Sequence, residues 1–228
     1  DIISNTKAEG FVGERMTIIP KEILSKYHEN VFVKRLYLTD VGFFPDAKGH
    51  YVSRPQGVEE YIFFYCITGK GVVKINDQPF TLSKNTALCI PKRCPHSYYS
   101  SDEEPWTILW VNFNGTDVNF YPLENVNPIV FRSAYSSNRM LFLFNQLFRV
   151  IDSSYTAQLN TIAVEAAVFV KYVRNLILQQ YFLPVKRFAK VIEFEPRQNS
   201  RLMPRGLNRQ MIVRIDENDK ARRPFGGS

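Results

Sequence analysis

The chain is long enough to bury a hydrophobic core, and its composition excludes several classes of protein. It has 228 residues, of which 45% are hydrophobic and 14% aromatic, so a fibrous or wholly disordered chain is excluded. No run approaches the roughly 20 apolar residues of a membrane span, and residues 1–20 mix charged with apolar residues, unlike a signal peptide. We therefore expect a soluble, cytoplasmic protein without a membrane partner.

The net charge of +7 is concentrated at the C-terminal end. Residues 183–228 contain eleven Lys and Arg against five Asp and Glu, which accounts for six of the seven positive charges. The preceding residues are nearly neutral, so any affinity for nucleic acid is expected in this C-terminal segment.

The three cysteines, Cys66, Cys89 and Cys94, suggest neither a disulfide framework nor a zinc site. Their number is odd and their spacing does not match that of zinc ligands. We expect buried or unreactive thiols.

Residues 31–113 read as strands. Short apolar or alternating runs are separated by turn residues, in VFVKRLYLTDVGFF, EEYIFFYCITGKG, VVKIND, PFTLS, TALCIP and WTILWVNFNG. This spacing predicts an antiparallel barrel or sandwich. Turns are expected at Gly69 to Gly71 and at Asn76-Asp77, because these residues tolerate the positive φ of tight hairpins. The pattern predicts a four-strand meander with hairpin connections.

After Asn138 the period becomes helical. Residues 140–152 place one stripe on a helix face: Leu141, Phe144, Leu147, Phe148 and Ile151. Residues 161–182 form a longer helix whose apolar positions are Ile162, Val164, Ala167, Val168, Val170, Val173, Leu176 and Ile177. This second surface exceeds one stripe, so the helix either packs between the barrel and another helix or subunit, or covers its own barrel alone. Periodicity leaves both readings open.

The stretch GKGVVKINDQPFTLSKNTALCIPKRCPHSYYSSDEEPWTILWVNFNG, residues 69–115, carries a family resemblance. It resembles the sugar-sensing N-terminal domains of AraC-type transcription regulators in four pieces that occur in order. These are a glycine turn, an IN-x-x-x-F/Y-x-L hairpin, an I-P-x-x-x-P-H-x-Y corner and a P-W-x-x-x-W-x-x-F strand. The resemblance extends over about residues 35–194. It implies a mainly β protein with α-helices, a cupin-like (jelly-roll) antiparallel β-barrel followed by two helices.

The resemblance also implies an effector pocket inside the barrel, for a sugar or another small polar molecule. Arg54 matches a family arginine that bonds ligand hydroxyls or a carboxylate, Tyr98 a position that offers a hydroxyl, and Trp110 an indole on which a sugar stacks. Ile108 stands where the arabinose-sensing member has a histidine, so a different ligand is expected. With His96 at the corner, these residues form the expected effector-binding set.

Each of these residues has a structural alternative. Arg54 could pair with Glu59 or Glu60 on the surface, and Tyr98 and Trp110 could simply fill the barrel. For His96, a corner histidine bonded to backbone is favoured over a ligand contact.

Metal binding and catalysis are not expected. Metal-binding cupins use two histidines one residue apart, a glutamate and a later histidine, and here only the last survives, as His96. Glu59 and Glu60 have no histidine beside them, and His28 and His50 lie outside the pattern. No phosphate loop, G-x-S-x-G elbow or Cys-His nucleophile pattern is present. We expect no cofactor and no enzyme activity.

The C-terminal end departs from the resemblance. AraC-type regulators continue with two helix-turn-helix units, and VKRFAKVIEF, residues 185–194, is similar to the entry of that domain. From Glu195 onward the pattern is lost among prolines and arginines, and QMIVRI is the one strand-like run. We expect an altered or truncated reading frame near Glu195, or else a natural short protein whose basic tail contacts nucleic acid weakly.

Three domains are predicted on this basis: a barrel at 1–132, a helical dimerisation region with the start of the DNA-binding linker at 133–194, and an irregular basic tail at 195–228. The expected function is an effector-sensing domain, a homodimer through the helix near 158–182, coupled to DNA where a helix-turn-helix domain is present. The alternatives are a stand-alone cupin sugar-binding protein or isomerase, and a basic-tailed adaptor without a ligand.

Overall fold

The computed structural model describes residues 6–31, 33–120, 123, 127–152 and 159–182. These residues belong to one compact unit that extends to Val185. The predicted DNA-binding entry at 185–194 and the predicted tail at 195–228 lie outside the described residues. Within the described part, no helix combines the length and apolar character that crossing a membrane requires.

Two antiparallel sheets form the barrel. The larger contains, in spatial order, β1 (Arg15–Ile18), β2 (Tyr37–Phe44), β9 (Thr107–Asn114), β4 (Tyr61–Thr68), β7 (Thr86–Ile90) and β10 (Ile129–Val130). The smaller contains β3 (Tyr51–Arg54), β8 (His96–Ser100), β5 (Lys70–Ile75) and β6 (Gln78–Ser83). From β3 to β9 the chain passes from one sheet to the other at nearly every connection, which is the arrangement of a jelly roll.

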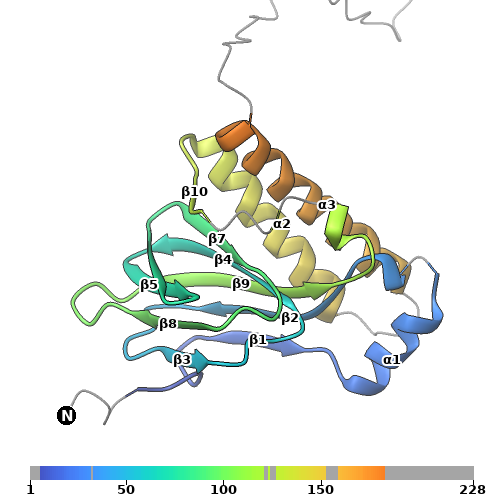
Figure 1. Cartoon of the computed structure of the whole chain (residues 1–228), viewed down its shortest axis with the longest axis horizontal. Coiled ribbons are helices and arrows are strands. Elements are labelled where there is room, and N and C mark those ends of the chain that lie inside the picture. Colours follow the sequence, from blue (N-terminus) through green and yellow to red (C-terminus); the bar gives the residue numbers. More distant parts are fainter. Residues whose placement is uncertain (1–5, 32, 121–122, 124–126, 153–158, 183–228) are drawn as a thin grey trace, which may run out of the picture. The chain divides into compact units, whose positions relative to one another are not determined.

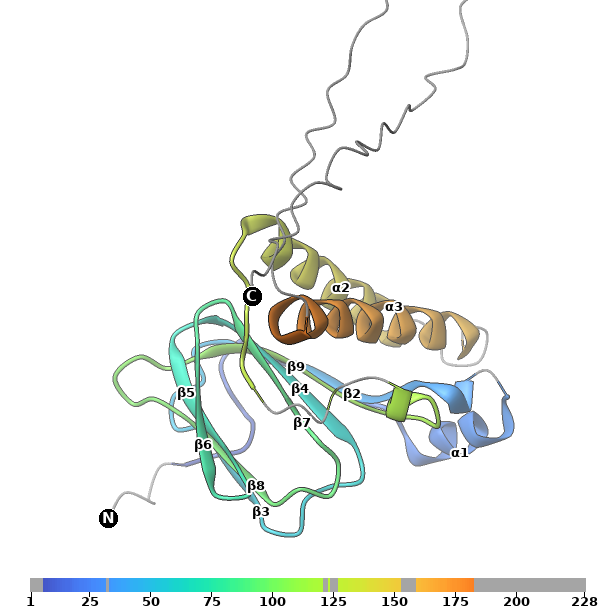
Figure 2. The ribbon, with the colours of Figure 1, turned by 45° about the horizontal axis from the view of Figure 1, so that its top comes forward.

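One helix lies between β1 and β2 in the chain, and two helices follow β10. They are α1 (Lys21–Glu29), α2 (Ala134–Asp152) and α3 (Leu159–Ile177), with 3₁₀ turns η1 (Val33–Arg35) and η2 (Val118–Phe120) and a π-helical turn η3 (Leu178–Phe182). Figure 1 shows α2 and α3 side by side along the larger sheet, and in Figure 2 this sheet lies between the two helices and the smaller sheet. The predicted cupin-like antiparallel barrel followed by two helices is confirmed, with α1 as an addition.

The predicted four-strand meander is wrong. Strands β5 and β6 do form the expected hairpin, with Asn76 and Asp77 at φ 48° and 64° in its turn. However, β4 pairs with β7 and β9, and β5 pairs with β8. Gly69 separates β4 from β5, and a Cβ there would lie 2.1 Å from the carbonyl oxygen of Pro105. This glycine therefore permits a crossing between sheets rather than a hairpin.

The larger sheet is buried on both faces, which explains why β4 reads as a continuous apolar run. One face contributes Tyr61, Phe63 and Tyr65 to the core shared with the helices. The opposite face contributes Ile62, Phe64 and Cys66 to the core inside the barrel. The sheet therefore separates two hydrophobic cores, and the barrel core surrounds the candidate site.

Helix α2 begins six residues before the predicted start at residue 140. Ser133 precedes it, and its hydroxyl accepts a hydrogen bond from the backbone N–H of Ser136, an N-terminal cap. The prediction that Leu141 lies on the buried stripe is wrong, since this side chain is 37% exposed. Met140 and Leu143 lie on the buried face of α2 instead. Leu141 lies at the edge of this face.

Helix α3 covers its own barrel and also packs against another helix. It contacts β2, η1 and α2, and its buried side chains include Phe169, Val170, Val173 and Ile177. Val168, on the opposite side, is 38% exposed. The side chains of Ile162 and Val164, also predicted to be apolar contacts, lie outside the described part. Contact with a second subunit remains a prediction.

Candidate functional site

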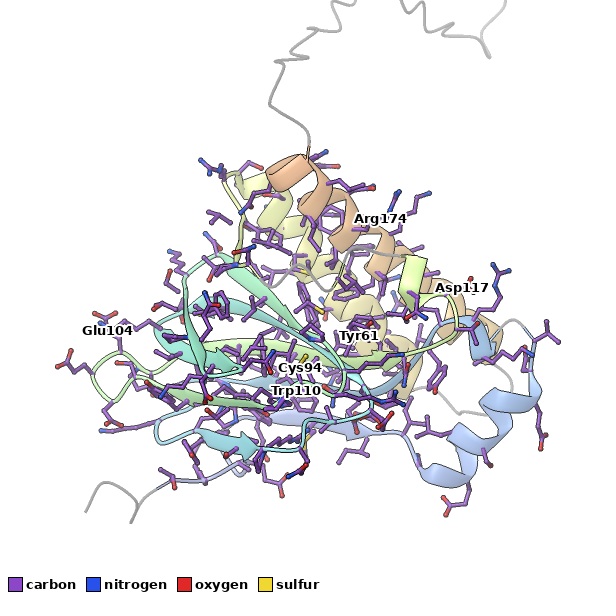
Figure 3. All side chains as sticks on the ribbon, in the orientation of Figure 1. Tyr61, Cys94, Glu104, Trp110, Asp117 and Arg174 are labelled. Atoms are coloured by element: carbon purple, nitrogen blue, oxygen red, sulfur yellow. The ribbon has the colours of Figure 1, made fainter. Side chains whose placement is uncertain are left out.

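A cavity of about 270 Å³ lies inside the barrel. Its lining comes from both sheets and from the segment before β1: Ala8, Glu9, Met16, Ile18, Asp40, Phe44, His50, Val52, Arg54, Glu60, Ile62, Phe64, Tyr98, Trp110 and Asn112. In Figure 3, Trp110 lies among the strands, whereas Glu104 lies on the loop that extends from them between β8 and β9. Most of the lining residues lie on regular strands, which position side chains more rigidly than loops do.

Three of the predicted site residues meet in this cavity. Arg54 on β3, Tyr98 on β8 and Trp110 on β9 all belong to its lining. Strands β3 and β8 are neighbours in the smaller sheet, whereas β9 belongs to the larger one. Residues separated by more than 50 positions are thus brought to one cavity by the closure of the barrel.

His96 is not among the lining residues. Its buried ring stacks parallel to that of Tyr98, with centroids 6.1 Å apart, and its Nδ1 lies 2.8 Å from the carbonyl oxygen of Cys94. Burial lowers the pKa of His96, with an added lowering from the charge of Arg54 and an opposing effect of the Cys94 carbonyl. The sequence favours a corner histidine that bonds to the backbone. The contact between Nδ1 of His96 and the Cys94 carbonyl has this geometry.

Ile108 also lies outside the cavity lining. It is fully buried in the barrel core and is the register partner of Cys66 on β4. It precedes Trp110 by two residues, so both side chains lie on the same face of β9. Its methyl groups therefore belong to the packed layer beside the cavity.

The indole of Trp110 is held by its neighbours and keeps a free donor. Phe44 contacts it edge to face, at a centroid distance of 5.4 Å. Trp110 is 9% exposed, and its buried Nε1 has no hydrogen-bond partner among the described residues. A buried N–H without a partner is unfavourable, so a residue of the cavity lining has an unsatisfied hydrogen-bond donor.

His50 is a cavity residue that sequence reasoning set aside. It is 2% exposed, and its Nδ1 accepts a hydrogen bond of 3.2 Å from Nε1 of Trp106. Burial lowers the pKa of His50 to about 4, so the ring is neutral at neutral pH and carries its proton on Nε2. This buried Nε2 has no partner within the described part of the chain. No local sequence signal identifies His50, which precedes a short strand without apolar alternation.

Asp40 and Asn112 add a polar pair that the sequence analysis also missed. They are register partners on β2 and β9, and the side-chain amide of Asn112 donates a hydrogen bond of 3.0 Å to Oδ2 of Asp40. The buried Oδ1 of Asn112 has no partner among the described residues. The available signal was a polar residue at an inward position within the apolar runs YLTDVGFF and WVNF.

Arg54 does not pair with Glu59, one of the two surface partners that the sequence left open as an alternative. Glu59 instead pairs with Arg93 at 2.8 Å on the surface, and this contact lowers the pKa of Glu59. Arg54 and Glu60 both line the cavity, and among the described residues neither forms an ion pair. The guanidinium of Arg54 is therefore available to a ligand.

No group of three or more His, Cys, Asp or Glu side chains within the described ranges is arranged to hold a metal ion.

Comparison with known proteins gives a family match and relatives among regulators. The family model described as the AraC-like ligand binding domain matches residues 41–168. The MmsAB operon regulatory protein of Pseudomonas aeruginosa is 26% identical over 145 residues, which cover 61% of this chain and 47% of that protein. The Msm operon regulatory protein of Streptococcus mutans is 26% identical over 101 residues, covering 43% and 34%. The chain thus spans at most about half the length of these relatives.

Similar solved structures include plu4264 protein from Photorhabdus luminescens, with 19% identity, a TM-score of 0.28 and coverage of 36% of this chain and 66% of that one. Another is KdgF from Halomonas sp., with 17% identity, a TM-score of 0.31 and coverage of 46% and 81%.

Proposed function

Because the chain belongs to the family of AraC-like ligand-binding domains, we propose that its barrel binds a small, hydroxyl-rich effector of the sugar or sugar-acid class. The proposal also holds that binding regulates transcription and that no reaction is catalysed. The observation that carries the proposal is the cavity lined by buried polar atoms without partners, the Nε2 of His50 and the Nε1 of Trp110. Its volume of about 270 Å³ suits a molecule smaller than a typical drug.

The hydrogen-bonding groups of the cavity fit hydroxyl groups. His50 and Trp110 offer N–H donors, whereas Oδ1 of Asn112 is an acceptor. A hydroxyl both donates and accepts, so a polyhydroxylated ligand satisfies both kinds of atom at once. The free-energy cost of leaving them unpaired in the interior makes such a ligand favourable.

The predicted residues supply the remaining contacts in this proposal. The indole of Trp110 packs against the C–H face of the ligand, Arg54 donates from the smaller sheet, and Tyr98 offers its hydroxyl. His96 acts through Tyr98, on whose ring it stacks. Ile108 acts through the packing beneath Trp110.

The regulatory output is proposed from the relatives, which are described as operon regulatory proteins. In this proposal the protein works in the cytoplasm as a homodimer, and ligand binding changes how DNA-binding parts are presented. The exposed Phe142 on α2 and Val168 on α3, at 50% and 38%, are apolar side chains that a partner subunit would cover. Sedimentation of the wild type and of a Phe142→Glu, Val168→Glu double variant tests this, and a monomeric wild type contradicts it.

Calorimetry and thermal-shift measurements with a panel of monosaccharides and uronic acids test the ligand site. We expect at least one to stabilise the wild type and to bind about tenfold or more weakly to Trp110→Ala, a loss of about 1.4 kcal/mol. Tyr135→Ala, an aromatic truncation at a side chain that is 79% exposed and outside the cavity, is the matched control and keeps wild-type affinity. Equal affinity in Trp110→Ala removes the pocket assignment, and a panel without any ligand removes the proposed sugar class.

A further inference from the structure

Oxygen acceptors are prominent in the lining of the cavity. Asn112 on β9 is the register partner of both Asp40 on β2 and Ile62 on β4. Glu60 directly precedes β4 and lines the same cavity. Asp40, Asn112 and Glu60 therefore contribute a carboxyl, a carboxamide and a second carboxyl to the lining.

Part of this acceptor group is unfilled. Oδ2 of Asp40 accepts hydrogen bonds from the Thr39 hydroxyl at 2.8 Å and from the Asn112 amide at 3.0 Å. Oδ1 of Asp40 accepts none from the described residues, and neither does the buried Oδ1 of Asn112. One oxygen of each side chain in this hydrogen-bonded pair is thus available to a donor with several N–H groups.

The charges of the lining are unbalanced. Glu9, Asp40 and Glu60 contribute three carboxyl groups, and Arg54 contributes the one guanidinium among the described lining residues. None of these four takes part in the ion pairs of the described chain. His50 adds no charge at neutral pH, because burial lowers its pKa to about 4. The cavity therefore favours a ligand with positive charge over one with negative charge.

The walls of the cavity reinforce this preference. Phe44, Phe64, Tyr98 and Trp110 line it, and the faces of aromatic rings attract cations through their quadrupoles. Carboxyl groups beside aromatic faces are the combination expected for an ammonium group.

We propose that the effector carries an ammonium group beside its hydroxyls, as an amino sugar or an amino polyol does. This inference rests on the proposed function and narrows its ligand class. The ammonium donates to Oδ1 of Asp40 and Oδ1 of Asn112, with Glu60 nearby, while His50 and Trp110 donate to hydroxyl oxygens. A sugar acid would instead add another carboxylate to a cavity whose described lining has three carboxyl groups and one guanidinium, and this excess of like charge disfavours its binding.

Matched ligand trios test the inference on the full chain. Each trio keeps one carbon skeleton and changes one terminal group between ammonium, hydroxyl and carboxylate: 6-amino-6-deoxyglucose, glucose and glucuronate; 6-amino-6-deoxygalactose, galactose and galacturonate; 3-amino-1,2-propanediol, glycerol and glycerate. By calorimetry, the amine of at least one trio is expected to bind about tenfold or more tightly than its two counterparts, because hydrogen bonds to charged groups are the stronger ones.

Two variants locate the preference. Asp40→Asn and Glu60→Gln keep the shape of each side chain and remove its charge, so each is expected to reduce the affinity for the amine about tenfold while leaving that for the neutral sugar nearly unchanged. Among the described residues the carboxyl of Glu60 accepts no side-chain hydrogen bond, unlike that of Asp40, so Glu60→Gln serves even where Asp40→Asn unfolds the protein. Asp102→Asn, on the exposed loop between β8 and β9, is the matched control.

The outcomes separate this inference from the proposed function. Preference for a neutral or acidic member, or an amine affinity unchanged in both variants, overturns the ammonium assignment and leaves the sugar site standing. Absence of binding by every amine also overturns it. The proposed function fails separately, when the wider panel contains no ligand whose affinity depends on Trp110.

Discussion

A Cβ atom on Gly42 would lie 2.2 Å from Cε2 of Trp110. The two residues are register partners on β2 and β9, so the indole of Trp110 occupies space that any side chain at position 42 would need. The requirement for glycine is steric here, because the backbone of Gly42 is not in the positive-φ region. A residue without a side chain therefore sets the position of the cavity's tryptophan.

Gly42→Ala is expected to displace the indole of Trp110. Crowding of a packed interior costs about 1–3 kcal/mol of stability, and the affinity for the effector is expected to fall about tenfold. Gly115→Ala is the control, since its Cβ would crowd the carbonyl oxygen of Arg35 at 2.2 Å and neither residue lines the cavity. Urea unfolding and calorimetry measure both effects. Wild-type affinity in Gly42→Ala would show that Trp110 does not need this position.

The stability of the protein is expected to fall as the pH drops from about 6.5 to about 4. Burial lowers the pKa of His50 from 6.5 to about 4, so in this window the unfolded state binds a proton that the folded state does not. The free energy of unfolding therefore rises with pH, by up to about 3 kcal/mol from this residue. Burial also lowers the pKa of His96, which acts in the same direction.

Urea unfolding between pH 7.5 and 4.5 measures this dependence. His50→Asn keeps an acceptor for the Trp106 indole but cannot titrate, so we expect a shallower pH dependence than in the wild type. His96→Asn is the comparison, and should flatten the curve less. Identical slopes in the wild type and His50→Asn would contradict a neutral, buried His50.

Phe169→Ala is expected to cost about 3–5 kcal/mol of stability. This side chain on α3 is fully buried, and its ring meets those of Phe63 and Phe144 edge to face, each at a centroid distance of 5.3 Å. The three rings join α3, β4 and α2. Val12→Ala, at a side chain that is 96% exposed, should change stability by less than about 0.5 kcal/mol. Chemical denaturation compares the two, and equal effects would mean that α3 is not part of the cooperative fold.

Cys66 and Cys89 are expected to be unreactive in the native protein. Burial raises the pKa of the Cys66 thiol to about 12 and raises that of Cys89 as well, and the thiolate is the reactive form. Titration with a chromogenic disulfide at pH 8 should therefore label only Cys94, which is partly exposed, in the native protein. Cys66 and Cys89 should react only after denaturation. Rapid labelling of Cys66 or Cys89 would contradict their burial.

Much of the secondary structure followed from residue patterns. The runs that became β2, β4, β5, β6, β7 and β9 could be identified from apolar spacing, because their side chains meet a core on one or both faces. The short strands β1, β3, β8 and β10 and the helix α1 were missed. In β3, YVSR presents two partly buried and two exposed residues, too short a pattern to distinguish from a loop.

The order of strands within the sheets could not be obtained in the same way. The runs before and after Gly69 suggested a hairpin, since a glycine between two apolar strands is a common turn signal. Whether the chain turns back or crosses to the other sheet depends on what lies against that glycine, and here it is the backbone of Pro105, 36 residues later.

Some residues of the candidate site could be identified from the sequence, and others could be identified only from the structure. Arg54, Tyr98 and Trp110 were identified from a linear motif, because that motif follows the strands that carry them. His50, Asp40 and Asn112 carry no motif, and each is a single polar residue in an apolar or irregular stretch. Their role becomes visible only in the tertiary structure, because barrel closure places all three side chains around one cavity.

By itself the sequence determined that this chain forms short antiparallel strands followed by two amphipathic helices, because periodicity records which side chains face a core. The tertiary structure alone decided which strands are neighbours and which polar atoms are left without partners inside the barrel. Pairing and burial depend on contacts between residues far apart in the chain, such as Asp40 with Asn112 and Trp106 with His50, and local patterns do not encode those contacts.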